Sequence, residues 1–408
     1  MLFIYHLALW KALTFKIKHV KIITTTIHPQ ADTIMKLTVN NKIRKTNRSQ
    51  IFKLLYKNDS LSKRDFQLQL GLSLPTVTQH LTDLLEEGLI YSNGYMTNTG
   101  GRNALTYSVA NDARLAIGLD VTRHHITAVV INLHGLVVAQ LRVRFTYERT
   151  KAYLQHLGEI VHQIISENSI DRSRILGVGI GLPGLTNASY DRVVYGKILD
   201  IEGTTTEDYS QYIDFPVRII NDANAACNIE LYSIDNTTSN GFYIMLSNNV
   251  GGAIFINNAV YTGDDFRSGE IGHLNIHPGG LQCYCGQRGC VDPYCSATVL
   301  TAISDGNLNQ FFELLDQGDA TARSIWSAYL QHLALAVRNV RILFDCPIII
   351  GGYVGAYIDK YLNELKEILD GYNSFDKNSD YVVACKYKTE SIAAGAALSF
   401  IKEFLSTI

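Results

Sequence analysis

The sequence lacks the features that mark membrane, secreted or disordered proteins. It has only 7 prolines in 408 residues, and 47% of its residues are hydrophobic against 18% charged, which is typical of a globular protein with sizeable cores. The apolar stretch over residues 1–15 is interrupted by Lys11 and is too short to cross a bilayer. It has neither the basic start nor the small-residue cleavage site of a signal peptide. We therefore expect a cytoplasmic protein without a membrane partner.

Cysteine is scarce and unevenly placed. Four of the 7 cysteines lie within residues 283–295. An odd number of clustered cysteines in a long chain argues against a disulfide framework and favours thiols in a reducing compartment.

The net charge is only −2, but the two ends of the chain differ. Residues 36–110 hold 10 lysines and arginines against 5 acidic residues, while residues 111–408 are rich in acidic residues. A basic head on an acidic body is expected where only the head meets a polyanion. We expect residues 1–40 to be a disordered or wrongly assigned extension, with the true start of the protein at Met35.

Residues 41–110 have the pattern of a winged helix-turn-helix. Ser62, with Asp65 three residues later, predicts a capping box at the start of a second helix that ends at Gly71. Ser73 is placed to cap a third helix. A turn at Asn93-Gly94 is predicted to join two strands into a wing.

The third helix is the candidate recognition helix. Its buried stripe is predicted to consist of Val77, Leu81, Leu84 and Leu85. The outer face then carries polar side chains that can read base edges in a major groove, namely Thr76, Thr78, Gln79 and His80. We expect Lys63 and Arg64 to meet phosphates, and Arg102, after two glycines, to enter a minor groove. The alternatives are a three-helix packing module without a DNA role and, around Arg102, a flexible linker.

Two strand meanders follow, each heading an α/β segment. The first is predicted over 115–121, 126–132 and 136–144, and the second over 241–247, 252–256 and 259–262. Further strands are expected at 175–180 and 216–220. Such a repeat predicts two similar lobes with a cleft between them, and clefts of that kind are favoured ligand sites.

One histidine and three cysteines form the strongest local motif. His273, Cys283, Cys285 and Cys290 lie within eighteen residues, and they supply a complete tetrahedral ligand set for Zn²⁺. Because no position is left for water, we predict a structural zinc rather than a catalytic one.

Carboxylates near this loop and at a strand end are candidates for ligand binding. Asp222 follows Asn221 at the junction of an apolar strand and a helix, where it can take a proton from a sugar hydroxyl or simply cap the helix. Glu270 and Asp292 flank the zinc loop, and with His273 they are predicted to form one wall of a sugar pocket. The alternative is that these are surface carboxylates beside a metal loop.

Together these motifs resemble the ROK family (repressors, open reading frames and sugar kinases), and specifically its branch of NagC/XylR-type repressors. The similarity covers nearly all of residues 41–408. It rests on Asn221–Ala226 and Gly269–Cys290, with support from Ile180–Gly184, Gly351-Gly352 and Ala393–Gly395.

The resemblance implies an α/β protein with an actin/hexokinase-like (ribonuclease H-like) double lobe behind the winged helix-turn-helix. It implies a first lobe over 111–235, a second lobe with the zinc loop over 236–390, and a C-terminal helix over 391–408 that returns to the first lobe. Gly184, Asn221, Asp222, Glu270, His273 and Asp292 take the positions of sugar contacts, although the family usually has Glu where this chain has Asp292. It also implies a homodimer or homotetramer.

The chain departs from the family's kinases in both phosphate loops. Those kinases begin the first lobe with Asp-x-Gly-Gly-Thr, whereas this chain reads Asp120-Val-Thr-Arg-His124. The second loop, normally Gly-Thr-Gly before a Gly-Gly pair, reads Ser247-Asn-Asn-Val250. Phosphate loops depend on a close backbone approach that side chains block, so we expect nucleotide binding to be lost.

The leading hypothesis is therefore a repressor of carbohydrate genes, not an enzyme, that binds operator DNA and responds to a sugar or sugar phosphate. The alternative is an ATP-dependent sugar kinase that uses Asp222 as its base and carries an appended DNA-binding domain. A third, weaker hypothesis is a DNA-binding scaffold that ignores sugars.

Overall fold

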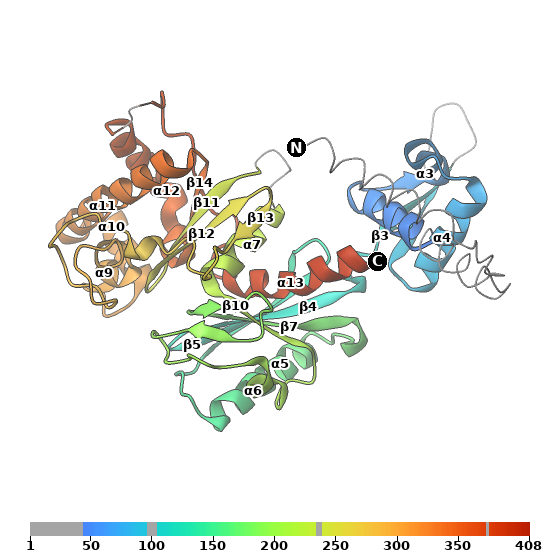
Figure 1. Ribbon diagram of the computed structural model, residues 1–408, viewed down its shortest axis with the longest axis horizontal. Coiled ribbons are helices and arrows are strands. Elements are labelled where there is room, and N and C mark those ends of the chain that lie inside the picture. Colours follow the sequence, from blue (N-terminus) through green and yellow to red (C-terminus); the bar gives the residue numbers. More distant parts are fainter. Residues whose placement is uncertain (1–43, 96–103, 234–238, 373–374) are drawn as a thin grey trace, which may run out of the picture.

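The computed structural model describes residues 44–95, 104–233, 239–372 and 375–408. It consists of a small N-terminal domain and two larger lobes, which are separate in outline in Figure 1. The extension expected over residues 1–40, including Met35, lies outside the described residues.

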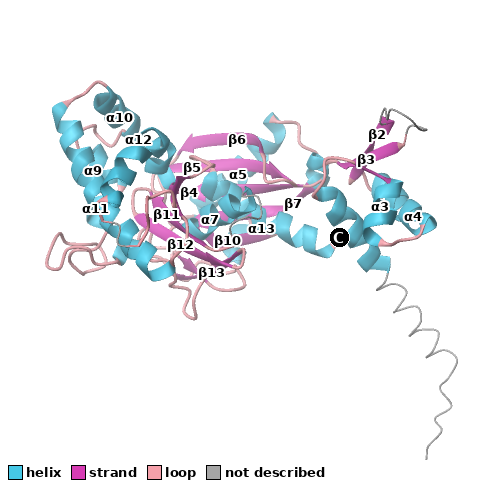
Figure 2. Ribbon diagram, turned by 90° about the horizontal axis from the view of Figure 1, so that it is seen from above, coloured by secondary structure: helices cyan, strands magenta, loops and turns pink. Residues whose placement is uncertain are grey.

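The N-terminal domain is a winged helix-turn-helix. Its elements are a helix over 44–56, β1 (Leu61–Ser62), α3 (Lys63–Leu70), α4 (Leu74–Glu86), β2 (Ile90–Tyr95) and β3 (Leu105–Val109). The three strands form one sheet in the order β1-β3-β2. Figure 2 shows this small sheet beside α3 and α4.

Local signals in the sequence fix the ends of the two central helices. Ser62 and Asp65 form the predicted capping box, and Gly71 ends α3 in the left-handed conformation at φ 66°. The Ser73 hydroxyl accepts a hydrogen bond from the Thr76 amide at the start of α4. These side chains satisfy backbone groups that a helix end would otherwise leave without partners.

The predicted turn at Asn93-Gly94 is wrong. These residues lie inside β2, where the pairing with β3 shifts register between Ser92 and Gly94. Gly94 has φ 80°, so the same glycine that favours a tight turn here accommodates a β-bulge.

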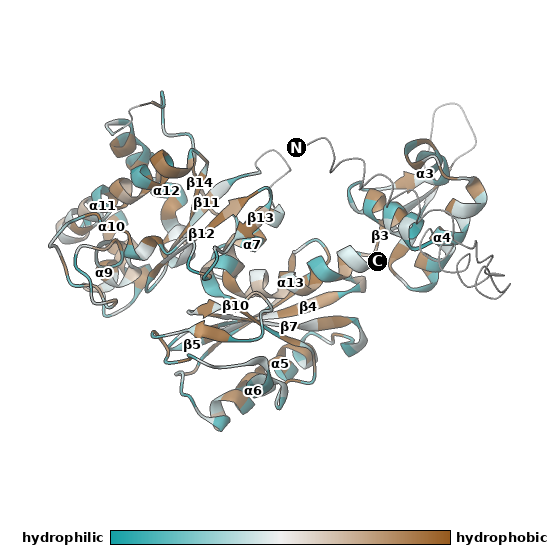
Figure 3. Ribbon diagram, in the orientation of Figure 1, coloured by the Kyte–Doolittle hydropathy of each residue, from teal (hydrophilic) through white to brown (hydrophobic). Residues whose placement is uncertain are grey.

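The first lobe is built on a five-stranded sheet in the order β10-β7-β4-β5-β6. Its strands are β4 (Leu115–Val121), β5 (His125–Asn132), β6 (Val137–Arg144), β7 (Ile175–Leu182) and β10 (Val217–Asn221). The pair β8 (Leu185–Thr186) and β9 (Val193–Tyr195) extends from it, and its helices are α5 (Lys151–Glu167), α6 (Thr206–Ser210) and α7 (Asp222–Ser233). In Figure 3 the central strands β4 and β7 are hydrophobic over most of their length.

The second lobe repeats this topology, with the order β13-β12-β11-β14-β15. Its strands are β11 (Gly241–Leu246), β12 (Val250–Ile256), β13 (Ala259–Tyr261), β14 (Ile348–Gly351) and β15 (Val382–Ala384). Its helices are α8 (Asp292–Cys295), α9 (Ala297–Thr301), α10 (Leu308–Asp316), α11 (Ala320–Phe344) and α12 (Gly352–Asp370). In each lobe the first strand of an antiparallel meander pairs with a parallel strand, which pairs in turn with a second parallel strand. The predicted duplication is therefore confirmed, and the fold is the expected actin/hexokinase-like double lobe.

The last helix, α13 (Ser391–Thr407), lies against the sheet of the first lobe and against α7 (Figure 1). Glycines make this close approach possible. A Cβ at Gly118 of β4 would lie 1.7 Å from the Ala393 carbonyl oxygen, and one at Gly395 would lie 1.7 Å from the Ala225 carbonyl oxygen. Hence α13 fixes the position of α7 relative to the sheet.

The N-terminal domain shares a continuous core with the first lobe and with α13. At this junction the Tyr56 ring, in the helix over 44–56, stacks on His134 with centroids 4.3 Å apart. The hydroxyls of Tyr56 and Tyr232 lie within hydrogen-bond distance of each other and of the Leu133 carbonyl oxygen, at 2.6 and 2.8 Å. With one proton on each hydroxyl, two of these three contacts are hydrogen bonds at any time. The N-terminal domain is thus docked onto the end of α7.

Among the described helices, none combines the length and the apolar character needed to span a membrane.

Candidate functional site

The cleft between the lobes brings together most of the predicted sugar contacts. Its inner part is lined by Gly184, Asn221, Asp222, Glu270 and His273. It opens into a cavity of about 750 Å³ that shares Asp222 and also reaches Asp120. A Cβ at Gly184 would lie 2.8 Å from the Tyr195 carbonyl oxygen, so only glycine fits at that turn.

The sequence left open whether Asp222 caps the helix or faces a ligand, and in the structure Asn221 and Asp222 each take one of these roles. The Asn221 side-chain oxygen accepts a hydrogen bond from the Asn224 amide at 3.0 Å, so it is Asn221 that caps α7. Its amide nitrogen donates to the Gly184 carbonyl at 3.1 Å. Asp222 accepts the Ala223 amide on Oδ1 at 2.8 Å and lines the cleft. The position suits Asp222 for accepting hydrogen bonds from a ligand.

Burial dominates the electrostatics of these carboxyl groups. It raises the pKa of Asp222 to about 7, an effect that the nearby Glu270 reinforces. Burial also raises the pKa of Asp120 to about 7, helped by the charge of Asp222 and opposed by Arg142. The pKa of Glu270 is raised by burial as well. Asp120 and Asp222 can therefore be protonated or ionised near neutral pH, so each can donate or accept a hydrogen bond there.

The four predicted metal ligands form one cluster, with their ligand atoms all within 4.8 Å of one another. The sulfurs of Cys285 and Cys290 are 3.8 Å apart, and the Cys283 sulfur is 3.6 Å from His273 Nδ1. A tetrahedral zinc with bonds of about 2.3 Å to sulfur and about 2.05 Å to nitrogen places such ligands roughly 3.8 and 3.6 Å apart. The geometry of the cluster therefore fits a metal ion of this kind.

His273 connects this cluster to the cleft. Its Nδ1 faces Cys283, while its Nε2 is 3.2 Å from the Tyr284 hydroxyl. Both His273 and Tyr284 line the inner cleft. The cluster thus holds one wall of the candidate site in place.

Asp292 lies close enough to His273 for the two charges to interact, but it does not line the inner cleft. It lines the larger cavity rather than the inner cleft, and its Oδ1 accepts the Val250 amide at 2.7 Å. Its carboxyl group therefore holds the start of β12 against α8.

The two turns at the predicted phosphate loops use their backbone groups internally. In the β4–β5 turn, the Thr122 amide donates to the His125 carbonyl at 3.0 Å, and the His125 amide donates to the Thr122 hydroxyl at 3.1 Å. In the β11–β12 turn, the Ser247 amide donates to Asn249, and the Val250 amide to Asp292. These four amides are not free to bind phosphate.

Two residues of α4 are not on the side of the helix that the sequence predicted. His80, expected outside, is 3% exposed, and Leu85, expected inside, is 38% exposed. The reason is helical spacing, because His80 lies three residues after Val77 and four before Leu84, on the same face. The outer-face placement of His80 is wrong, and with it the role of this side chain as a base contact.

The other predicted DNA contacts are on accessible positions where the structure describes them. Gln79 and Arg64 are exposed, and Lys63, Thr76 and Thr78 are half-buried. Arg102 lies outside the described residues.

Sequence reasoning missed several residues of the cleft. Lys197, in the loop after β9, lines both the inner cleft and the larger cavity. Tyr353, in the first turn of α12, reaches across the cleft to the Thr122 side chain. No local pattern marks either residue, because each reaches the site through packing between distant segments.

Comparison with known proteins gives two family matches. Residues 116–403 match the model of the ROK family, and residues 44–91 match a model described as winged helix-turn-helix DNA-binding. The chain is 26% identical to the xylose repressor of Bacillus subtilis over 63% of this chain and 67% of that protein. It is 22% identical to the DNA-binding transcriptional dual regulator NagC of Escherichia coli over 74% of this chain and 79% of that protein.

Among solved structures, a ROK family transcriptional regulator, homologous to the Escherichia coli MLC protein, is similar over 90% of this chain and 97% of that one. The TM-score is 0.68 and the identity 21%. A ROK family glucokinase from Streptomyces griseus, solved with glucose and AMPPNP, is similar over 70% of this chain and 98% of that one, with a TM-score of 0.58 and 22% identity.

Proposed function

Because this chain belongs to the ROK family and carries a winged helix-turn-helix ahead of the family domain, we propose that it is a transcriptional repressor whose affinity for operator DNA is set by a sugar or sugar phosphate. The ligand binds between the two lobes, and the genes controlled are those of carbohydrate uptake or catabolism. The names of the relatives, which refer to xylose and N-acetylglucosamine repressors, support this class of effector.

One observation carries the proposal: a single helix joins the candidate sugar site to the DNA-binding domain. α7 begins at Asp222, in the cleft, and its last turn holds Tyr232, which meets Tyr56 of the N-terminal domain. At about 1.5 Å per residue, its 12 residues span roughly 18 Å. A ligand that moves the start of α7 therefore moves the seat of the DNA-binding domain.

Regulation requires the sugar to bind one conformation better than another. Lobe closure around a ligand that contacts Asp222 in one lobe and Glu270 in the other changes the position of α7. The coupling energy between ligand and DNA in such systems is typically ~1–3 kcal/mol. The free energy of the hydrogen bonds that join Tyr56 and Tyr232 is comparable to this coupling energy.

The sugar contacts proposed are Gly184, Asn221, Asp222, Glu270 and His273. Asp222 and Glu270 are acceptors for vicinal hydroxyl groups, and Asn221 is held in place by its bonds to the Gly184 carbonyl and the Asn224 amide. Asp292 is proposed as a contact only for a ligand large enough to reach the outer cavity that it lines.

The domain is proposed to lack kinase activity. Four amides at the ends of the two phosphate-loop turns are already hydrogen-bonded within the chain, and Tyr353 reaches across the cleft to Thr122. Asp222 then remains as a ligand contact rather than as a base for phosphoryl transfer.

We propose Zn²⁺ as the metal of the His273, Cys283, Cys285 and Cys290 cluster. Bound there, the ion supplies a structural crosslink with no open coordination position. The chain's own contribution is to hold His273 and Tyr284 against the inner cleft.

On the DNA side, Thr76, Thr78 and Gln79 are proposed to read base edges, and Lys63, Arg64 and Arg102 to contact the backbone or minor groove. We propose that the chain acts as a homodimer or homotetramer on a palindromic site, since two-fold assemblies favour such operators.

A panel of sugars tests the proposal against its kinase alternative. Thermal unfolding of the full chain is measured with xylose, glucose, N-acetylglucosamine and their phosphates, each with and without Mg-ATP. The proposal expects stabilisation by at least one of these ligands, no further effect of Mg-ATP and no ADP release. ATP-dependent phosphorylation of any of the sugars would support the kinase instead.

A further inference from the structure

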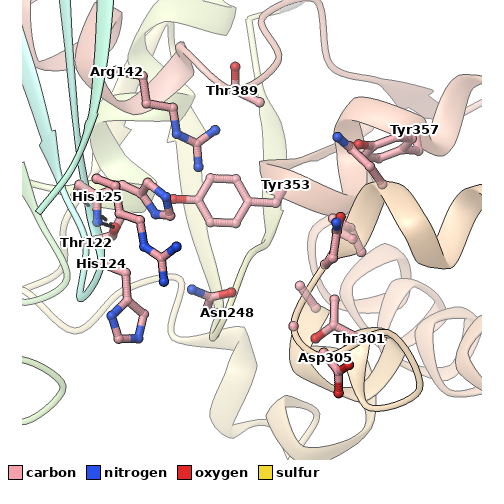
Figure 4. Close-up of a pocket in the computed structure, with 16 residues that line it drawn as sticks. Thr122, His124, His125, Arg142, Asn248, Thr301, Asp305, Tyr353, Tyr357 and Thr389 are labelled. Atoms are coloured by element: carbon pink, nitrogen blue, oxygen red, sulfur yellow. Dashed lines mark hydrogen bonds between the residues drawn. The ribbon is translucent and has the colours of Figure 1, made fainter. Parts of the chain in front are cut away.

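A cavity of about 660 Å³ lies at the outer end of the cleft, beyond the part that the proposed sugar contacts occupy. One wall comes from β5 and β6 of the first lobe, with His124, His125, Arg142 and Arg144. The other wall comes from the second lobe and includes Asn248 and Tyr353 (Figure 4). Its volume is in the range of small-molecule sites.

The charge of this cavity is positive. Neither Arg142 nor Arg144 has an ion-pair partner among the residues that the structure describes. Asp305 is the one carboxylate among the lining residues, and it stands on the opposite wall. Figure 4 shows the Arg142 guanidinium reaching into the space beside His125 and the Tyr353 ring.

Strand register concentrates this charge instead of dispersing it. His125 pairs directly with Arg144, and Thr127 with Arg142, so the two arginines and His125 share one face of the sheet. Like charges directly opposite each other destabilise a strand pair. The pKa of His125 is lowered, mainly by burial and further by the neighbouring arginines, so this histidine avoids adding a third charge.

Protection of a sheet edge is the competing explanation, since β6 is an edge strand and charged side chains discourage unwanted pairing. Both arginines are exposed, as protection requires. They also line a cavity whose far wall, apart from Asp305, is built by the other lobe from uncharged residues that include Asn248 and Tyr353, which edge protection does not need. The arrangement is that of a binding site for an anion.

We propose that this cavity binds the phosphate group of a phosphate monoester, with Arg142 and Arg144 as the charge partners. Arginine forms paired, charge-assisted hydrogen bonds with phosphate oxygens. A nucleotide needs backbone amides at these turns, four of which are already hydrogen-bonded, whereas a single phosphate group held by two arginines needs none of them. For a phosphorylated sugar the inference rests on the proposed function and names the residues that hold its phosphate.

The phosphate has two possible sources, because the cavity is continuous with the inner cleft. The large middle cavity shares Thr122, His124 and Tyr353 with the outer one, and Asp222 and Lys197 with the inner one. The group therefore belongs either to a phosphorylated sugar that spans the cleft or to a separate phosphorylated metabolite beside an uncharged sugar.

The test is calorimetric titration of the full chain, without DNA, with glycerol phosphate, inorganic phosphate and glucose 6-phosphate at constant ionic strength. Arg142→Gln/Arg144→Gln should weaken binding of these probes at least tenfold, about 1.4 kcal/mol. The control Arg174→Gln removes one exposed arginine of the same lobe outside the cleft and should leave binding unchanged. The variant Asp222→Asn then identifies the source of the phosphate. If one ligand spans the cleft, this variant should bind glucose 6-phosphate more weakly and the other two probes as the wild type does.

Unliganded stability provides a second readout. Relief of like-charge repulsion predicts that the double variant unfolds at the same or a higher temperature than the wild type. The proposal is overturned if phosphate probes bind no better than chloride, if the double variant binds them like the wild type, or if it unfolds at a clearly lower temperature. DNA is absent throughout, so failure of the regulator proposal cannot produce any of these outcomes.

Discussion

Replacing Tyr232 with phenylalanine should weaken the control of a sugar over DNA binding without weakening either binding event alone. The variant loses the one hydrogen bond that the Tyr232 hydroxyl donates, either to the Leu133 carbonyl at 2.8 Å or to the Tyr56 hydroxyl. Tyr56 keeps its own bond to Leu133 and its stacking on His134, so the N-terminal domain stays docked. The lost bond contributes about 0.5–1.5 kcal/mol, which is comparable to the lower part of a typical coupling energy of ~1–3 kcal/mol.

The assay compares DNA affinity with and without saturating sugar, by fluorescence anisotropy on a duplex selected by the wild-type protein from a random pool. Tyr232→Phe should reduce the sugar-induced change in Kd about fivefold or more, which is about 1 kcal/mol. Tyr261→Phe, on β13 and 50% exposed, is the matched control and should behave like the wild type. Wild-type coupling in Tyr232→Phe, with both affinities intact, would refute the role of α7.

Three further predictions address separate parts of the molecule. Asp120→Asn should stabilise the fold at pH 8 by up to roughly 4 kcal/mol and far less at pH 5. The reason is that burial raises the pKa of this carboxyl group from 3.8 to about 7, so its ionisation costs stability as pH rises through that range. Equal gains at both pH values in denaturant unfolding would contradict this. The Cys285→Ser variant should contain no zinc when measured by atomic spectroscopy, and its thermal stability and sugar affinity should both be lower. The control Cys346→Ser should keep its zinc, and unchanged sugar affinity in zinc-free protein would show that the pocket is misplaced. Gln79→Ala should abolish specific DNA binding at unchanged stability, while His80→Ala, at a buried position, should lower the unfolding temperature; the reverse pattern would argue for a base-contacting His80.

Much of the fold was predictable because local rules and packing agree. The strands over 115–121, 241–247 and 259–262 follow from apolar runs bounded by turn residues, and the structure has β4, β11 and β13 there, within a residue at their ends. The cap at Ser62 and the stop at Gly71 are equally local. The prediction of a turn at Asn93-Gly94 failed because a glycine with positive φ fits a β-bulge as well as a turn.

The candidate site was predictable only in part. The cysteine and histidine cluster is close in sequence, so its spacing alone identifies it. The placement of His80 failed because it was assigned by its polar character, although its spacing from Val77 and Leu84 puts it on the buried face. Other contacts join different lobes or domains, and no local pattern specifies them. These are the approach of Arg142 to Tyr353 in the cavity and that of Tyr56 to Tyr232.

The most direct test of the account is a titration of the full chain with Mg-AMPPNP and with the sugar that stabilises it best, followed by calorimetry. The account predicts that the sugar binds and that its affinity falls in Asp222→Asn, while the nucleotide gives no binding heat with or without the sugar. Saturable nucleotide binding in the cleft would contradict it.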